Sequence, residues 1–117
     1  MKAPLIAIVD DDESVCVGMT SLVRSLGYDV RAYGSAEDFL GSEARGDTPC
    51  LISDVQMPGS MNGIDLAEWI ARELPRVKVL LTSGKVAHDE VGDWPLLAKP
   101  YRLGALEGQL RAFLDPG

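Results

Sequence analysis

The sequence has little of what staples small proteins or binds soft metals. Its 117 residues include only two cysteines and one histidine. Cys16 and Cys50 lack metal-ligand spacing and have apolar neighbours, so we expect both as small core residues in a reducing compartment. His88 stands beside Asp89 and Glu90, which is typical of a solvated loop, and we assign it no role. These counts go against a disulfide scaffold and a cysteine–histidine metal site.

Basic residues and long apolar runs are scarce as well. With 11 Lys and Arg against 18 Asp and Glu, the net charge is −7, and the basic residues are dispersed singly. Because binding to a phosphate backbone needs a basic stripe, we expect no direct contact with nucleic acid. The first apolar run, residues 5–9, is too short to span a membrane, and acidic residues follow at once. We therefore expect a cytoplasmic protein without membrane contact.

What is present is the composition of one ordinary globular domain. Apolar residues make up 46% of the chain and charged residues 25%, which is far from the composition of disordered proteins. A chain of this length buries roughly two-thirds of its unfolded surface, enough for one core without a metal or a disulfide. We expect a single domain over residues 1–117, with no segment left for an output domain.

Apolar patterning predicts how strands and helices alternate. Runs typical of strands buried on both faces of a parallel sheet cover residues 5–9, 50–53, 77–81 and 96–98. Residues 28–33 alternate charged and less polar side chains, as an edge strand does. Helical spacing of apolar residues predicts longer helices over 15–26, 64–74 and 103–114. Ser35 can cap a short helix that ends by Gly46, and Gly27 and Pro75 mark the ends of two others.

This alternation predicts an α/β fold with a doubly wound, five-stranded parallel sheet built from five βα units. The fourth unit is the weakest, because only 12 residues separate Thr82 from Pro95 and glycines interrupt them. We expect a shortened fourth helix there, a turn or two at most, or irregular chain.

Polar residues stand where four of the strands end: Asp10–Asp12, Asp54, Thr82–Ser83 and Lys99. Parallel strands bring their carboxyl ends to one rim, so we expect these side chains to lie close together. Carboxylates gathered there repel one another, and Mg²⁺ would relieve the repulsion while keeping waters or phosphate oxygens as further ligands. Asp54 could then attack phosphorus and form an aspartyl phosphate, with Lys99 and the Thr82 hydroxyl neutralising charge.

These residues, in this order, resemble the receiver domain of two-component response regulators over essentially the whole chain. The resemblance is carried by Val9-Asp10-Asp11, Asp54 with Met57-Pro58, Thr82 and Lys99-Pro100. It implies a flavodoxin-like fold and a domain that is not an enzyme but a phosphoacceptor. A histidine kinase or a histidine phosphotransfer protein would phosphorylate it on Asp54, and it would signal by protein contact.

The resemblance also implies roles at the rim. Mg²⁺ would be bound directly by Asp11, by Asp54 and by the backbone carbonyl of Gln56, and through water by Asp10. Lys99 would pair with the phosphoryl oxygens, and Thr82 would turn towards them after transfer. Gln56 and Gly84 lie two positions after Asp54 and Thr82, where side chains could control water access and thus the lifetime of the phosphate.

Three departures from the family pattern stand out. Besides the short fourth unit, Leu96 occupies a position where the family often has an aromatic switch residue, and Tyr101 follows the Lys-Pro pair. The loop of residues 59–63 is one residue longer than the commonest form. Such a combination hints at receivers associated with hybrid sensor kinases.

Two alternatives stay open. Asp10, Asp12 and Ser14 resemble the nucleophile motif of haloacid dehalogenase-type phosphatases, although after Lys99 only Glu107 and Asp115 could supply that family's later acids. A receiver-like interaction module that never carries phosphate is the other. We expect Trp69 and Trp94 to be packing residues or part of a partner surface rather than cofactor contacts.

Overall fold

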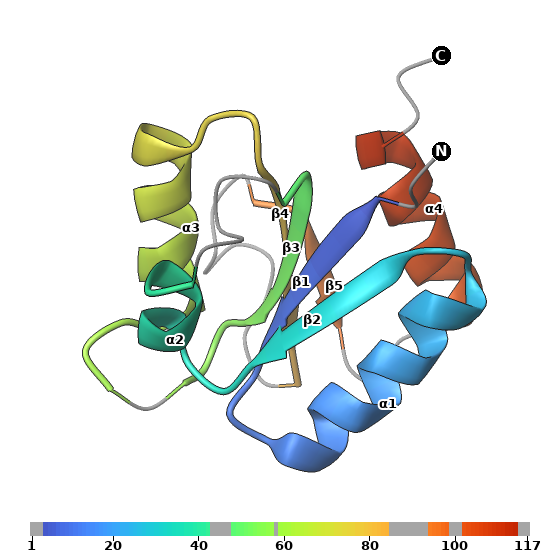
Figure 1. The fold of residues 1–117 in the computed structure, drawn as a ribbon, viewed down its shortest axis with the longest axis horizontal. Coiled ribbons are helices and arrows are strands. Elements are labelled where there is room, and N and C mark those ends of the chain that lie inside the picture. Colours follow the sequence, from blue (N-terminus) through green and yellow to red (C-terminus); the bar gives the residue numbers. More distant parts are fainter. Residues whose placement is uncertain (1–3, 43–47, 58, 85–93, 99–101, 115–117) are drawn as a thin grey trace.

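The computed structural model describes residues 4–42, 48–57, 59–84, 94–98 and 102–114 (Figure 1). The elements within these ranges are β1 (Leu5–Val9), α1 (Glu13–Ser25), β2 (Asp29–Tyr33), α2 (Ala36–Leu40), β3 (Cys50–Asp54), α3 (Gly63–Glu73), β4 (Lys78–Ser83), β5 (Leu96–Ala98) and α4 (Leu103–Leu114). The strands form one parallel sheet in the order β2-β1-β3-β4-β5. The predicted five-stranded parallel sheet is confirmed, with β2 at an edge.

Helices cover both faces of this sheet, α2 and α3 on one side and α1 and α4 on the other (Figure 1). Side chains alternate along a strand, so each buried strand supplies both cores. On β1, Ile6 and Ile8 pack with α1 and α4, whereas Ala7 and Val9 pack with α2 and α3. The doubly wound architecture is therefore confirmed.

Helix α1 is bounded by local signals. The Asp12 side chain accepts hydrogen bonds from the backbone N–H groups of the first turn and caps the helix. At the other end, Gly27 has φ +99° and donates to the Arg24 carbonyl, while the Tyr28 N–H reaches the Val23 carbonyl. These two bonds form a Schellman motif, for which the left-handed conformation of Gly27 is needed.

Helices α2 and α3 also begin at capping residues. Ser35 caps α2 by accepting from the Asp38 N–H at 3.1 Å, as predicted, and the helix ends at Leu40. Asn62 and Asp65 form a reciprocal capping box at the start of α3. The helix starts at Gly63, one residue before the predicted start, because Asn62 supplies the cap.

Some predictions fall outside the described residues. The shortened fourth helix was expected between Thr82 and Pro95, and most of that segment, residues 85–93, lies outside them. The described ranges contain four helices, and β5 pairs with β4 from Leu96 to Ala98. No helix in the described part of the chain has the length and apolar character that a membrane crossing needs.

Candidate functional site

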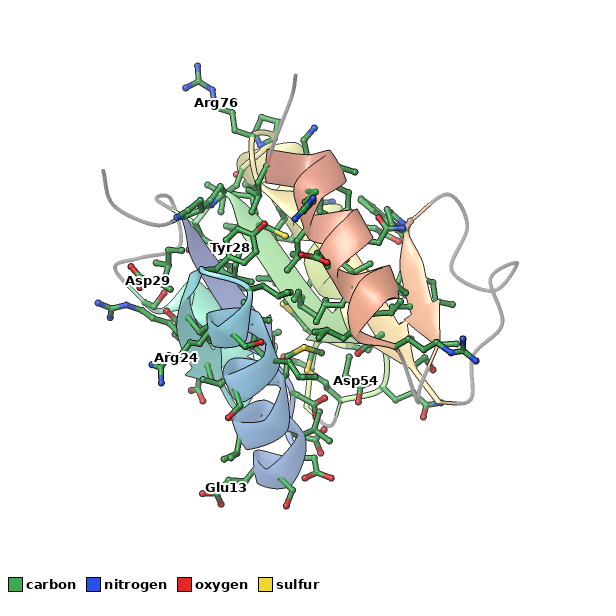
Figure 2. The ribbon with its side chains drawn as sticks, turned by 90° about the vertical axis from the view of Figure 1, so that its right-hand side faces the viewer. Glu13, Arg24, Tyr28, Asp29, Asp54 and Arg76 are labelled. Carbon is green, nitrogen blue, oxygen red and sulfur yellow. The ribbon has the colours of Figure 1, made fainter. Side chains whose placement is uncertain are left out.

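Three aspartates meet at the carboxyl ends of two neighbouring strands, β1 and β3. Asp10 directly follows β1, Asp11 comes next, and Asp54 is the last residue of β3, which pairs with β1. One carboxylate oxygen from each lies within 4.8 Å of the others. Asp10 is buried at 3% exposed, Asp54 is half-buried and Asp11 is exposed, so the cluster opens to solvent on one side. In Figure 2, Asp54 lies towards the end of the molecule marked by Glu13, and Arg76 lies at the opposite end.

Asp10 is held by three kinds of contact. Its backbone N–H donates to the Tyr33 carbonyl of β2 at 3.1 Å, which extends the sheet by one residue. Its Oδ1 accepts from the Asp12 N–H at 2.9 Å, and its carbonyl accepts from the Cys16 thiol at 3.2 Å. The carboxylate is therefore fixed in place by the turn that leads into α1.

Asp54 is fixed by the strand and by the loop that follows. Its Oδ1 accepts from the Gln56 N–H at 3.3 Å, and its carbonyl accepts from the Ser53 hydroxyl at 3.0 Å. The next residue, Val55, donates its N–H to the Thr82 carbonyl at 2.9 Å and so continues the β3–β4 ladder. The acceptor candidate is thus attached to a strand whose other four residues are buried.

Gly63 lets α3 begin directly against this strand end. Its N–H donates to the Val55 carbonyl at 2.9 Å. A Cβ at this position would collide with the Asp54 carbonyl oxygen and would lie 2.8 Å from Val55 Cα. Only glycine allows this approach without a shift of the backbone.

The remaining predicted site residues have different outcomes. Thr82 is buried at 2% exposed, and it pairs in register with Asp54, which places it beside the aspartates. Gln56 is exposed, and its backbone N–H donates to Asp54 Oδ1, which places the residue next to the cluster, while the role of its carbonyl stays a prediction. Lys99, Pro100 and Tyr101 lie outside the described residues, and the role of Lys99 stays a prediction. Lys99 follows Ala98, whose strand partner is Ser83.

The donor set fits a hard divalent cation. Three carboxylates within 4.8 Å of one another repel at neutral pH, and a cation placed among them would lower that free energy. Carboxylate and carbonyl oxygens are ligands that Mg²⁺ prefers, and Mg²⁺ keeps waters where a site is open. The exposure of Asp11 leaves room for such waters.

The other acids near this end have structural tasks. Asp12, which the phosphatase hypothesis would use in catalysis, accepts from the Ser14 and Val15 N–H groups and caps α1. Glu107, a candidate later acid of that hypothesis, pairs with Arg111 at 3.1 Å on α4. Both observations go against the phosphatase alternative.

Sequence reasoning missed several residues around the cluster. Ser53 and Gly63 contact the Asp54 backbone, yet only the position of Gly63 directly before an apolar helical stripe could have pointed to it. Cys16 packs half-buried against the α1–α4 core, as predicted in part, and it also lies at the site, where burial, followed by the nearby Asp10 carboxylate, raises the pKa of its thiol. Trp69 and Trp94 pack against the α2–α3 core, so their predicted packing role is confirmed.

The family model described as the response regulator receiver domain matches residues 6–107, most of the chain. The chain belongs to the response regulator receiver family. Receiver domains are signalling domains of two-component systems, and they bind Mg²⁺ at an acidic pocket of this kind. The family assignment leaves no support for the phosphatase alternative.

Curated relatives agree with this assignment, and a solved structure shares the fold. The response regulator protein TodT of Pseudomonas putida is 35% identical over 114 residues, 97% of this chain and 47% of the relative. The transcriptional regulatory protein FixJ of Bradyrhizobium diazoefficiens is 29% identical over 110 residues, 94% of this chain and 50% of the relative. The signal receiver domain of an HD domain-containing protein from Pseudomonas fluorescens Pf-5 superposes with a TM-score of 0.86 at 24% identity, covering 98% and 97% of the two chains. This receiver chain spans about half the length of the curated relatives it matches.

Proposed function

We propose that the domain is phosphorylated on Asp54 by a phosphohistidine of a histidine kinase or a histidine phosphotransfer protein. The observation that carries the proposal is the convergence of the Asp10, Asp11 and Asp54 carboxylates, with Asp54 at the end of a buried strand and open to solvent. The family match agrees with it. A carboxylate oxygen of Asp54 forms a bond to phosphorus while the P–N bond breaks, and the released imidazole takes up a proton.

Each rim residue then has a stated task. Asp11, Asp54 and the Gln56 carbonyl would hold Mg²⁺ directly, and Asp10 would hold it through water. Bound Mg²⁺ supplies charge neutralisation at the phosphoryl oxygens. Lys99 pairs with the same oxygens, and the Thr82 hydroxyl donates to one of them after transfer. Because phosphoryl transfer depends on positioning and charge, these groups suffice without a separate base.

The phosphorylation state would be transmitted by direct contact with a partner protein. Phosphate on Asp54 would favour one arrangement of the Thr82 and Lys99 loops over another. A partner protein that binds this arrangement more tightly would then bind the phosphorylated domain more tightly. With a net charge of −7, the domain itself has no basic stripe for nucleic acid. We propose that phosphoryl transfer from the histidine kinase to this domain takes place in the cytoplasm.

Mass spectrometry tests the acceptor directly. The protein is incubated with Mg²⁺ and acetyl phosphate, and intact-mass and peptide measurements should find one acid-stable, base-labile phosphoryl group on Asp54. Asp54→Asn should abolish it. Asp12→Asn is a matched control that should keep it, because Asn caps α1 as well as Asp does.

Other outcomes would overturn the proposal. A phosphoryl group on Asp10 instead of Asp54 would revive the phosphatase mechanism. If no group appears with acetyl phosphate or with histidine kinases supplied, the domain is a receiver-like binding module that does not carry phosphate.

A further inference from the structure

The lengthened loop between β3 and α3 reaches across to helix α2. The Ser60 hydroxyl donates to Glu37 Oε1 at 2.9 Å, joining residues 23 positions apart. Gly59 also lies against the Glu37 side chain, because a Cβ added to it would lie 3.5 Å from both carboxylate oxygens of Glu37. The φ of Gly59 is +101°. The loop backbone therefore bends directly against this carboxylate, in a conformation that favours glycine.

Hydrogen-bond donors from both elements lower the pKa of the exposed Glu37 carboxylate. Its pKa is lowered first by its own backbone N–H in the first turn of α2, then by the Ser60 hydroxyl. The Ser35 hydroxyl and the Met61 backbone lower the pKa further. Donors that favour the charged form hold a carboxylate ionised, and charge-assisted bonds are stronger than neutral ones. Glu37 thus holds the loop through the Ser60 hydroxyl, beside the close approach of Gly59.

The two ends of this loop are fixed at the acidic cluster and at α3. At the first end, Gln56 donates its N–H to Asp54 Oδ1 at 3.3 Å. At the second end, the Asn62 N–H donates to Asp65 Oδ2 at 3.1 Å, and Gly63 is bonded to the Val55 carbonyl. The hydrogen bond between Glu37 and Ser60 falls between these two ends, and Pro58, which separates Gln56 and Met57 from Gly59, lies outside the described residues.

We propose that Glu37 is a positioning residue for the acceptor site, which holds the loop at Gly59 and Ser60 and thereby keeps the Gln56 carbonyl in place for the cation. The proposal rests on the proposed function, because Gln56 acts there as a Mg²⁺ ligand. Removing a group that orients a metal ligand without itself touching the metal weakens metal binding, often by about 10-fold or more. Since Glu37 acts through a loop, we expect a smaller effect.

The test measures how phosphorylation by acetyl phosphate depends on Mg²⁺ concentration, read by intact mass. Ser60→Ala removes one donor without changing the charge, and it should raise the half-saturating Mg²⁺ concentration about 3-fold or more while the rate at saturating Mg²⁺ stays within a factor of two. Glu37→Ala should do the same or more, and Ser60→Thr, which keeps the hydroxyl, should restore wild-type behaviour. Calorimetric titration with Mg²⁺ alone should show the same weakening.

Two controls separate this coupling from simpler effects. Glu68→Ala removes an equal charge from an exposed position on α3 and measures the long-range effect of charge on Mg²⁺ binding. In the Ser60→Ala background, Glu37→Ala should cost less than it does alone, because residues in one network are not additive. A chemical unfolding curve for each variant confirms that the fold is retained.

The two proposals fail in different ways. If the wild-type protein takes no phosphoryl group on Asp54, the proposed function is wrong. If it does, but Ser60→Ala and Glu37→Ala follow the wild-type Mg²⁺ dependence or behave only as Glu68→Ala does, the role of Glu37 is wrong and the function stands. Additive effects of Glu37→Ala and Ser60→Ala would also overturn it.

Discussion

The interior of the sheet and its carboxyl-end rim use the same faces of the same strands for opposite purposes. Along β1, β3 and β4, an aliphatic side chain lies two residues before a polar one, and alternation puts both on the face covered by α1 and α4. The pairs are Ile8 with Asp10, Ile52 with Asp54, and Leu80 with Thr82. The aliphatic members are at most 2% exposed.

The difference shows where stability comes from and where it is given up. Interior positions bury apolar surface and stabilise the fold. At the rim, four buried polar residues gather: Asp10, Ser53, Thr82 and Ser83. Such groups bury less apolar surface than the aliphatic interior does and need hydrogen-bond partners, and three carboxylates in close range add repulsion. We infer that the interior stabilises a rim arranged for chemistry.

We expect the largest loss of stability from truncating a buried side chain on β3. Ile52→Ala removes a buried side chain on the face of the sheet covered by α1 and α4 and should lower the free energy of unfolding by about 2–5 kcal/mol, measured by urea denaturation. The control is Val17→Ala on α1, where the side chain is 62% exposed and the change should be within about 0.5 kcal/mol. Similar losses for the two variants would mean that the interior is not the source of stability.

A smaller loss is expected where the rim meets α3. Gly63→Ala pushes a Cβ into the Asp54 carbonyl and the Val55 backbone, and should destabilise by about 1–3 kcal/mol through backbone shift. Gly108→Ala is the matched control: nothing lies within 4 Å of its added Cβ, and helix propensity should stabilise α4 by about 1 kcal/mol. Thermal and urea unfolding give both values. If the close approach at Gly63 is real, Gly63→Ala must lower the free energy of unfolding and Gly108→Ala must raise it.

The pH dependence of stability provides a third comparison, between the buried thiol of Cys50 in the interior and the thiol of Cys16 beside the rim. Burial raises the pKa of the Cys50 thiol to about 12, against an ordinary value of 9.0. Between these values the unfolded chain has lost the proton while the native state keeps it, so stability is full below pH 9 and falls as pH rises. The loss is about 1.4 kcal/mol per pH unit at most. Reduced wild-type protein should therefore lose more stability from pH 8 to pH 10 than Cys50→Ala does, in urea unfolding.

Cys16 provides the comparison for that measurement. It is half-buried beside the rim, and burial and the Asp10 carboxylate raise the pKa of its thiol as well. Because its exposure is greater, Cys16→Ala should change the slope less than Cys50→Ala does. Equal slopes for wild type and Cys50→Ala would contradict the buried, neutral thiol.

The sequence predicted the parts of this molecule that depend on local pattern. Apolar runs that stop at acids placed Asp10, Asp11 and Asp54 at one rim, and turn chemistry predicted the cap at Ser35 and the end of a helix at Gly27. Parallel pairing then brings strand ends together whatever the loops do. Local preference and global fold agree at these positions.

The contacts that sequence reasoning missed join segments that are distant in the chain or depend on how closely a helix approaches. The hydrogen bond between Glu37 and Ser60 depends on where α2 and the β3–α3 loop come to lie in the tertiary fold. The approach of Gly63 to the Asp54 carbonyl depends on the entry angle of α3. No spacing rule encodes either distance, since each follows from packing of the complete sheet and its helices.

The smallest effect, and the one of opposite sign, should come from relieving the rim itself. Asp10→Asn removes one of three crowded charges, and its amide oxygen can still accept from the Asp12 N–H. In EDTA we expect unfolding to require about 1 kcal/mol more than in the wild type. In millimolar Mg²⁺ we expect the wild type to gain stability by binding the cation, and the variant to lose most of that gain.

Asp12→Asn shows whether any change in charge near the rim would do the same. Its side chain caps α1, and an asparagine keeps the cap, so its response to Mg²⁺ should match that of the wild type. If Asp10→Asn were less stable than the wild type in EDTA, repulsion among the carboxylates would not be the cost that the rim imposes. The buried hydrogen bonds of Asp10 would then stabilise the fold as the aliphatic interior does, and the contrast between interior and rim would disappear on β1.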